Sequence, residues 1–284
     1  MNKDRGLSVA MCVYGGDNPD TFDVAVKSVI NQTYCPYEIV IVIDGPIPNT
    51  IETVIRKYRE QLMGSSIKMN VIRLEKNMGH GEARKICIEN CSCDLIALMD
   101  ADDISVSERF EKQIDYFNSH SDVSVVGGNI TEFIDSSQPE DISNTAGKRI
   151  VAEGDSEIKE YMKRRCPMNQ VTVMFKKADI AAVGGYIDWY CEEDFYLWIR
   201  LALAGKKFGN ICENLVYVRV GEEMYRRRGG MRYFISEAKL QKLMLQKHII
   251  TFPRFLVNVA ERFIVQILLP NRLRGLIFQR FARD

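Results

Sequence analysis

The feature that most constrains the fold is a pattern that repeats four times in the first half of the chain. Each repeat has a short apolar run, a break of glycine, proline or polar residues, and then apolar residues at helical spacing. The apolar runs are Leu7 to Val13, Glu38 to Asp44, Met69 to Leu74 and Asp94 to Asp100. Such runs are typical of strands buried on both faces, and strands that alternate with helices form parallel sheets. The sequence predicts an α/β fold: a mostly parallel central sheet, helices on both faces and further C-terminal helices.

Helix starts are visible at two of the breaks. Asn18 is a good N-cap, and Pro19 follows it at the first helical position. After the fourth run, Ser105 or Ser107 is a candidate cap for a helix that carries Phe110.

The second half of the chain is less regular. It predicts strands from Val123 to Ile130 and from Gln170 to Phe175, a loop from Ser136 to Gly154, and a helix that begins near Glu192. We divide the chain into an α/β domain, residues 1–220, and a basic C-terminal part, residues 221–284.

Acidic side chains follow three of the four predicted strands. Asp17 comes just after the first strand, Asp44 ends the second, and Asp100 and Asp102 come at the end of the fourth. Ligands of such sheets bind at the carboxyl ends of the strands, where gathered carboxylates repel one another unless a cation or ligand is bound. The chain has neither GxGxxG nor GxxxxGK(S/T) to bind phosphate. A metal held by Asp is the remaining way to neutralise a diphosphate.

Two interpretations of the run ALMDADDIS, Ala97 to Ser105, stay open. Its three carboxylates suit a solvated turn or the cap of the next helix. Carboxylate oxygens are also hard ligands for Mg²⁺ or Mn²⁺.

A second acidic run, Glu192 to Asp194, stands between Tyr190 and Phe195 at the predicted start of a helix. Acids at a helix N-terminus interact favourably with the helix dipole, which is one interpretation. A carboxylate partly removed from water among aromatic side chains is also a plausible general base.

Charge is unevenly distributed, although the formal net charge is zero. Residues 221–284 hold 13 Lys and Arg against 5 Asp and Glu, a net of +8, so residues 1–220 carry −8. A basic segment suggests an anionic partner. The arginine-rich stretch Met224 to Tyr233 is either a solvated basic loop or a mobile loop that closes on a bound diphosphate. The tail from Thr251 is either a packed helix or an interfacial helix at anionic lipid, and its sparse acids favour the second.

Targeting and cysteine patterns predict a cytoplasmic protein, and the basic, apolar tail predicts contact with the inner face of the plasma membrane. No run reaches the roughly 18 apolar residues of a spanning helix, and the polar start Met1 to Gly6 does not resemble a signal peptide. The eight cysteines include no CxxC pair, so we expect small buried thiols in a reducing cytosol.

The order of these motifs resembles that of the family 2 glycosyltransferases, over roughly Leu7 to Tyr233. The matching segments are SVAMCVYGGD with AVKSVINQT, EIVIVIDGP, NMGHGEARKICIENC, LMDADDIS and EEDFYLWIRL. The resemblance implies the nucleotide-diphospho-sugar transferase (GT-A) fold. It also implies inverting transfer of a sugar from a UDP- or GDP-sugar to a hydroxyl of a glycan or lipid-linked acceptor in surface polysaccharide biosynthesis. The chain departs from the family at Asp44-Gly45-Pro46, where a second Asp and a Ser are common.

The resemblance also implies roles for individual residues. Asp194 would be the general base, Glu193 would position it or the acceptor, and Asp102 would hold Mg²⁺ or Mn²⁺ on the diphosphate. Tyr14 and Asp44 would contact the nucleoside. The donor site would comprise Val13, Tyr14, Gly15, Asp17, Asp44, Asn77, Gly79, Arg84, Asp100, Ala101, Arg227 and Arg228. No nucleic acid partner is expected.

Three rival functions fit the residues less well. A phosphatase would place a DxDx(T/V) motif after the first strand, whereas DADDI follows the fourth. A nucleotidyltransferase would carry a lysine in the loop after the first strand, and YGGDNPD has none. A sugar-nucleotide-binding protein without transferase activity would not need both Asp102 and Asp194.

Overall fold

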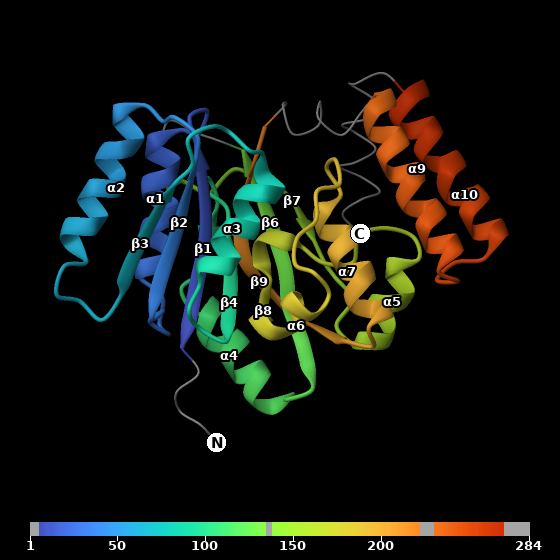
Figure 1. The fold of residues 1–284 in the computed structure, drawn as a ribbon, viewed down its shortest axis with the longest axis horizontal. Helices are drawn as coiled ribbons and strands as arrows, with labels where there is room; N and C mark the ends of the chain where they lie inside the picture. Colours follow the sequence, from blue (N-terminus) through green and yellow to red (C-terminus); the bar gives the residue numbers. More distant parts are fainter. Residues whose placement is uncertain (1–5, 135–137, 222–229, 270–284) are drawn as a thin grey trace.

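The computed structural model describes residues 6–134, 138–221 and 230–269 (Figure 1). The strands are β1 (Leu7–Tyr14), β2 (Glu38–Asp44), β3 (Lys68–Arg73), β4 (Leu95–Met99), β5 (Ile104–Ser105), β6 (Val123–Ile134), β7 (Thr145–Arg149), β8 (Met174–Lys176) and β9 (Lys207–Val220). The helices are α1 (Pro19–Ile30), α2 (Asn49–Gln61), α3 (His80–Asn90), α4 (Arg109–Ser119), α5 (Asp155–Met162), α6 (Lys177–Ala182), α7 (Glu193–Leu203), α9 (Met231–Gln246) and α10 (Phe252–Phe263).

The described strands form one nine-stranded sheet in the order β3-β2-β1-β4-β8-β6-β9-β5, with β7 paired to β6. β1 runs parallel to β2 and β4, β2 to β3, and β6 to β9. The short strand β8 runs antiparallel to both β4 and β6. The predicted α/β class and mostly parallel sheet are confirmed, and the four apolar runs are all strands.

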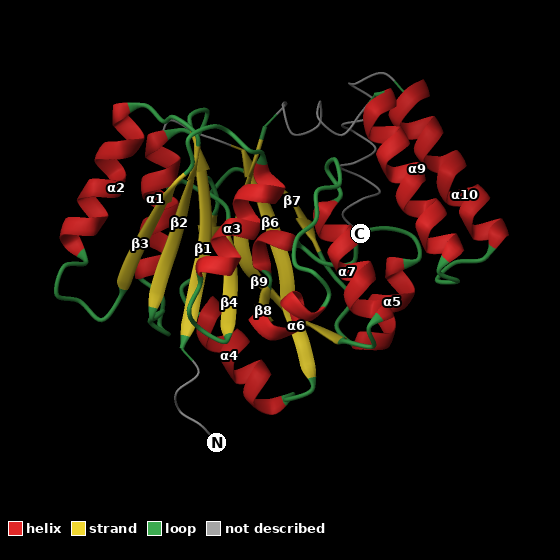
Figure 2. Ribbon diagram, in the orientation of Figure 1, coloured by secondary structure: helices red, strands yellow, loops and turns green. Residues whose placement is uncertain are grey.

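Alternate side chains of the strands enter two separate cores, which lie on the two faces of the sheet (Figure 2). On β1, Leu7 and Val9 pack with α1, α2 and α4, whereas Ala10 packs on the other face with α3 and α7. Both faces are therefore covered by helices, which explains why these strands are apolar without alternation.

The start of α1 agrees with the sequence prediction, and the start of α4 does not. Asn18 Oδ1 accepts the Asp20 amide at 2.8 Å, with Pro19 at the first helical position. Neither Ser105 nor Ser107 caps α4, which begins after Glu108 without a side-chain cap. Ser105 lies in β5, and its hydroxyl instead accepts a hydrogen bond from Gln32 Nε2 at 3.2 Å.

In the second half of the chain, the strands differ from those that the local sequence pattern predicts, because they pair with strands distant in the sequence. β6 extends four residues beyond the predicted Ile130, and β7 lies inside the predicted loop. The predicted strand from Gln170 begins instead as a 3₁₀ turn, because Thr172 Oγ1 donates to Asn169 O at 2.6 Å. β9 was not predicted at all; it pairs with β6 through several register shifts, which destroy any simple alternation.

The C-terminal helices α9 and α10 lie side by side at one end of the molecule (Figure 1). α9 packs Leu240 and Met244 into the core that holds α3 and α7. None of the described helices has the length and apolar composition needed to cross a bilayer.

The outer helix α10 buries polar side chains and exposes apolar ones. Asn258 is buried, and its Nδ2 donates to Gln241 Oε1 at 2.7 Å and to Lys163 O at 2.8 Å. Phe252 and Leu256 expose 59% and 51% of their surface. The polar contacts therefore fix α10 to α9 and to the end of α5, and an apolar face is left outside.

Candidate active site

One large cavity, of about 1360 Å³, extends from the carboxyl ends of β1, β2 and β4 to α10. Ten predicted site residues line it: Val13, Tyr14, Asp17, Asp44, Asn77, Gly79, Asp100, Ala101, Asp102 and Asp194. Gly15, Arg84 and Glu193 are not among the lining residues. Arg227 and Arg228 lie outside the described residues. The volume exceeds the roughly 300–1,000 Å³ of ordinary ligand sites, so it has room for two substrates.

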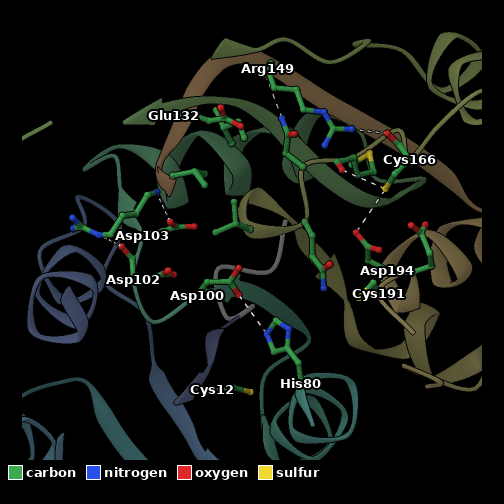
Figure 3. Close-up of a pocket in the computed structure, with 18 of the residues that line it drawn as sticks. Cys12, His80, Asp100, Asp102, Asp103, Glu132, Arg149, Cys166, Cys191 and Asp194 are labelled. Carbon is green, nitrogen blue, oxygen red and sulfur yellow. Dashed lines mark hydrogen bonds and ion pairs between the residues drawn. The ribbon is translucent and has the colours of Figure 1, made fainter. Parts of the chain in front are cut away.

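Carboxylates from two loops face one another at the sheet end of this cavity (Figure 3). Burial raises the pKa of Asp17 to about 6, with a further contribution from the charge of Asp100. The pKa of Asp102 also rises to about 6, because of burial first and then the charges of Asp100 and Asp17. Asp102 is well exposed, but it faces the cavity rather than the outer surface. A cation would relieve this mutual repulsion.

Asp103, which has no role predicted from the sequence, stabilises the loop Asp100–Asp103 through its contact with Arg219. Its carboxylate is buried and accepts the Arg219 amide at 2.8 Å. The side chain of Arg219 makes a second contact with the same loop, since its Nε donates to Asp102 O at 3.0 Å. β9, which contributes Arg219, therefore fixes the loop that carries Asp100 and Asp102.

Asp44 organises the loop after β3. Its two carboxylate oxygens accept the amides of Met78 at 2.6 Å and Gly79 at 3.1 Å. The neighbouring Gly45 has a φ of 86°, and a Cβ there would lie 2.6 Å from Asn77 N. This close approach of two loops requires glycine in the Asp44-Gly45-Pro46 segment.

Arg84 lies behind the cavity wall and connects its two acidic parts. The guanidinium is only 4% exposed. Its Nη2 donates to Asp100 Oδ1 at 3.0 Å and contacts His80 Nε2 at 2.7 Å, and its Nη1 lies 3.6 Å from Glu193 Oε1. Burial opposes the charge, but Asp100 and Glu193 hold the pKa of Arg84 above its ordinary value.

Asp194, at the start of α7, is partly buried. Its Oδ1 accepts the Phe195 amide at 2.7 Å, and Cys166 Sγ lies 3.7 Å from its Oδ2. With the Gln170 amide oriented to suit its neighbours, its nitrogen donates to Asp194 Oδ2 at 2.9 Å and its oxygen accepts from Arg84. Burial raises the pKa of Asp194, so its proton affinity is higher than that of a solvated carboxylate.

Glu192 differs from the two acids that follow it, because it is buried beneath α9. Its Oε1 accepts a hydrogen bond from the Tyr233 hydroxyl at 2.9 Å, and burial raises its pKa well above the ordinary value. Cys191, just before it, adopts a left-handed φ of 57°. Few residues other than glycine adopt this conformation, and those that do are enriched at functional sites.

The opposite end of the cavity is basic, and sequence reasoning missed it. Five arginines line this end: Arg149, Arg164, Arg165, Arg254 and Arg262. They come from β7, the end of α5 and α10, which meet only in the folded chain. The sequence signal was the run Lys163-Arg164-Arg165.

Metal ligands and thiols complete the description of the site. Among the described side chains, no group of three or more His, Cys, Asp and Glu residues is placed to hold a metal ion. All eight cysteines are free, and Cys35, Cys191 and Cys212 are exposed, contrary to the expectation that the thiols are buried.

Comparison with known proteins places this geometry in a family. The model of glycosyl transferase family 2 matches residues 8–179. A UDP-Gal:alpha-D-GlcNAc-diphosphoundecaprenol beta-1,3-galactosyltransferase of Escherichia coli is 34% identical, over 98% of this chain and 96% of its own length. The amylovoran biosynthesis glycosyltransferase AmsE of Erwinia amylovora is 30% identical, over 96% of this chain and 98% of its own.

Solved structures agree on the fold. S. aureus TarS 1-349 in complex with UDP-GlcNAc superposes with a TM-score of 0.66 at 15% identity, over 91% of this chain and 72% of that one. The mannosyltransferase PcManGT of Pyrobaculum calidifontis, in complex with GDP-Man and Mn2+, gives 0.63 at 12% identity, over 94% and 71%. The chain belongs to glycosyl transferase family 2 and has the GT-A fold.

Proposed function

We propose that this glycosyltransferase moves a sugar, with inversion, from a UDP- or GDP-sugar to a hydroxyl of a lipid-linked glycan in surface polysaccharide biosynthesis. The observation that carries the proposal is one cavity in which the carboxylates after β4 and the Asp194 carboxylate face the same space. The names of the Escherichia coli and Erwinia amylovora relatives support the substrate class.

The donor binds at the sheet end of the cavity. Tyr14 and Asp44 contact the nucleoside, and Val13, Gly15, Asn77, Gly79 and Ala101 shape the loops around it. Because both oxygens of Asp44 already accept backbone amides, the carboxylate is held in one orientation before the donor arrives. Arg84 is a positioning residue, since it is buried and directed at Asp100 and Glu193.

The carboxylates at this end fit Mg²⁺ or Mn²⁺. Their oxygens are hard donors, and burial together with the neighbouring carboxylates raises the pKa of Asp17 and of Asp102. Asp102 would hold the ion together with oxygens of the donor diphosphate, because the described side chains do not form a complete metal site. When bound, the ion supplies Lewis-acid stabilisation of the leaving diphosphate.

Asp194 is the general base. The acceptor hydroxyl attacks the anomeric carbon from the side opposite the diphosphate, and Asp194 Oδ2 takes its proton as the new bond forms. Glu193 and Gln170 keep this carboxylate connected to Arg84. A single displacement inverts the anomeric configuration.

The apolar outer face of α10 supports a peripheral contact with the cytoplasmic surface of the membrane. Phe252 and Leu256 on α10, and Leu268 in the π-helical turn Ile264–Leu268 that follows it, are each more than half exposed. The contact would bring the cavity to an acceptor that is itself anchored in lipid.

The test is a transfer assay with the full chain, Mn²⁺ and a set of donors: UDP-galactose, UDP-glucose, UDP-N-acetylglucosamine and GDP-mannose. The acceptor is α-N-acetylglucosaminyl diphosphate with an undecyl chain. We expect one donor to give a product with inverted anomeric configuration by NMR. A folded protein that transfers no sugar from any donor would overturn the proposal, as would a product with retained configuration.

A further inference from the structure

The end of the cavity beside α10 gathers five arginines from β7, the end of α5 and α10. Arg262 is paired with Glu237 at 3.2 Å, and both side chains are largely buried. The other lining arginines are Arg149, Arg164, Arg165 and Arg254, and the acids Glu132, Glu192 and Glu261 line the same cavity. A concentration of guanidinium groups in a cavity is suited to phosphate oxygens.

Contacts between α5 and α10 hold these arginines together. Arg262 Nη2 donates to Arg164 O at 2.8 Å, and Asn258 Nδ2 donates to the preceding carbonyl, that of Lys163, at 2.8 Å. The charges of Arg164 and Arg254 both lower the pKa of the Glu160 carboxyl, after the larger effect of Lys163. Two arginines that are far apart in the sequence therefore face the same region.

Arg149 connects this region to the base. Its Nη2 donates to Cys166 O at 2.6 Å, while the thiol of the same cysteine lies 3.7 Å from Asp194 Oδ2. Figure 3 shows Arg149, Cys166 and Asp194 together on one side of the cavity, across from Asp100 and Asp102. A sugar whose hydroxyl reaches Asp194 would direct its other end toward the arginines.

We propose that Arg164, Arg165 and Arg254, with Arg149 at the inner edge, bind the diphosphate of a lipid-linked acceptor. This inference rests on the proposed function, and it adds a subsite for the acceptor. In a sugar diphospholipid, one sugar ring separates the accepting hydroxyl from the first phosphate, which matches the order Asp194, Arg149 and then the outer arginines. The lipid chain would leave along α10, whose outer face is apolar.

The two ends of the cavity would distinguish two diphosphates by charge. The donor diphosphate lies among carboxylates and needs a cation, whereas the acceptor diphosphate lies among guanidinium groups and does not. Binding of a lipid diphosphate without any divalent cation is therefore a specific readout of the proposed subsite.

The experiment measures binding of undecyl diphosphate to the full chain in EDTA by calorimetry. We compare the wild type with Arg164→Gln, with the double variant Arg164→Gln/Arg254→Gln, and with the control Arg56→Gln, an exposed arginine on α2. We expect affinity to fall roughly 10-fold for each cavity arginine removed, as for the loss of a charge-assisted contact. The control should bind like the wild type. UDP binding in Mn²⁺ checks that each variant is folded.

Two results would overturn the subsite: no binding of undecyl diphosphate to the wild type, or equal binding by wild type and double variant. Either result leaves the transferase proposal intact if sugar transfer is observed. Conversely, cation-independent binding that depends on the arginines supports the subsite even if no donor is used. The wild type should also prefer the diphospholipid acceptor over undecyl α-N-acetylglucosaminide, and this preference should fall in the double variant.

Discussion

At the scale of single residues, Arg84 connects the two acidic parts of the cavity, to which we assign donor binding and the general base. Its guanidinium is buried between Asp100 on one side and Glu193 on the other. It also reaches Asp194 through the Gln170 amide. Ionisation at either end therefore changes the electrostatic environment of the other, because in a poorly solvated region charges interact strongly.

Replacing the proposed base should separate catalysis from donor binding. Asp194→Asn keeps the shape of the side chain but cannot accept the proton, so we expect turnover to fall roughly 10²–10⁴-fold. UDP affinity in Mn²⁺ should stay within about twofold of wild type, as measured by calorimetry. Asp188→Asn, an exposed carboxylate in the same segment, is the matched control. Wild-type turnover in Asp194→Asn would move the role to another residue.

Replacing Asp102 should remove the effect of the metal. We expect Mn²⁺ to strengthen UDP binding to the wild type, and this gain to fall roughly tenfold or more in Asp102→Asn, because one charged ligand is lost. Asp115→Asn, which is exposed on α4, should behave like the wild type. If the gain from Mn²⁺ is the same in all three proteins, Asp102 is not the metal ligand.

The raised pKa of Asp17 predicts a stability effect with a definite sign. The folded pKa of about 6 lies above the ordinary 3.8, so the folded protein holds this proton more tightly than the unfolded chain. As pH rises from about 4 through about 6, the carboxyl ionises inside the cavity, and this lowers the free energy of unfolding.

We therefore expect Asp17→Asn to become progressively more stable than wild type over that pH range, without metal or nucleotide. The measurement is thermal unfolding in parallel with Asp20→Asn, a nearby exposed carboxylate. A difference between Asp17→Asn and wild type that does not change with pH would contradict this explanation.

The carboxylates of the site could be predicted from the sequence, and most of the cationic groups could not. Asp17, Asp44, Asp100 and Asp102 follow apolar strands directly, so the topology rule alone brings them to one edge. The basic end depends on how α5 and α10 pack, and no local pattern contains that information. Asp103 was missed because its partner, Arg219, comes from the distant strand β9.

At the scale of elements, the local sequence pattern and the strand pairing of the folded chain agree in the first half and conflict in the second half. β1, β2 and β4 are nearly continuous apolar runs, and helices separate β1 to β4 along the chain, so each prediction needed only neighbouring residues. β9 follows β6 through register shifts that end the alternation of its side chains. Its polar residues are accommodated by specific contacts, such as Asn210 Nδ2 donating to Ala152 O at 2.6 Å.

The hydrogen bond between α9 and the acidic run should be measurable. Tyr233→Phe removes the hydroxyl that donates to Glu192 Oε1 at 2.9 Å, and we expect unfolding to become easier by about 1–3 kcal/mol. Turnover should also fall, because Glu192 precedes Glu193 and Asp194 directly. A double-mutant cycle with Glu192→Gln should give non-additive changes. Additive changes would show that the bond does not connect the helix to the site.

At the scale of the whole molecule, the proposed membrane contact is confined to one end. α2 and β3 lie at one end, and α9 and α10 at the other (Figure 1). Asn258 and Gln266 of this segment are buried, whereas Phe252, Leu256 and Leu268 are more than half exposed, so its outer surface is unusually apolar.

Vesicle flotation tests whether this face contacts lipid. We expect the full chain to float with vesicles that contain anionic phospholipid at low salt. Leu256→Gln combined with Leu268→Gln should weaken this binding by more than roughly tenfold, since each buried leucine contributes about 1.5–3 kcal/mol. Met63→Gln changes a methionine that is 80% exposed near the end of α2, and it should have no effect. If all three proteins float equally, α10 is not the contact.

The hydrogen bonds between α9 and the segment before α7 limit how new specificities can arise in this family by exchange of parts. Trp189 Nε1 donates to Ser236 O at 3.2 Å, and Ser236 Oγ donates to Tyr190 O at 2.7 Å. A chimera that receives α9 and α10 from a relative without a hydroxyl at position 236 would lose the second contact and disturb the acidic run beside it. A graft that also carries residues 189–192 of the same relative would keep the hydrogen bonds between the two segments. Recombination breakpoints between functional relatives should therefore fall outside this pair of segments.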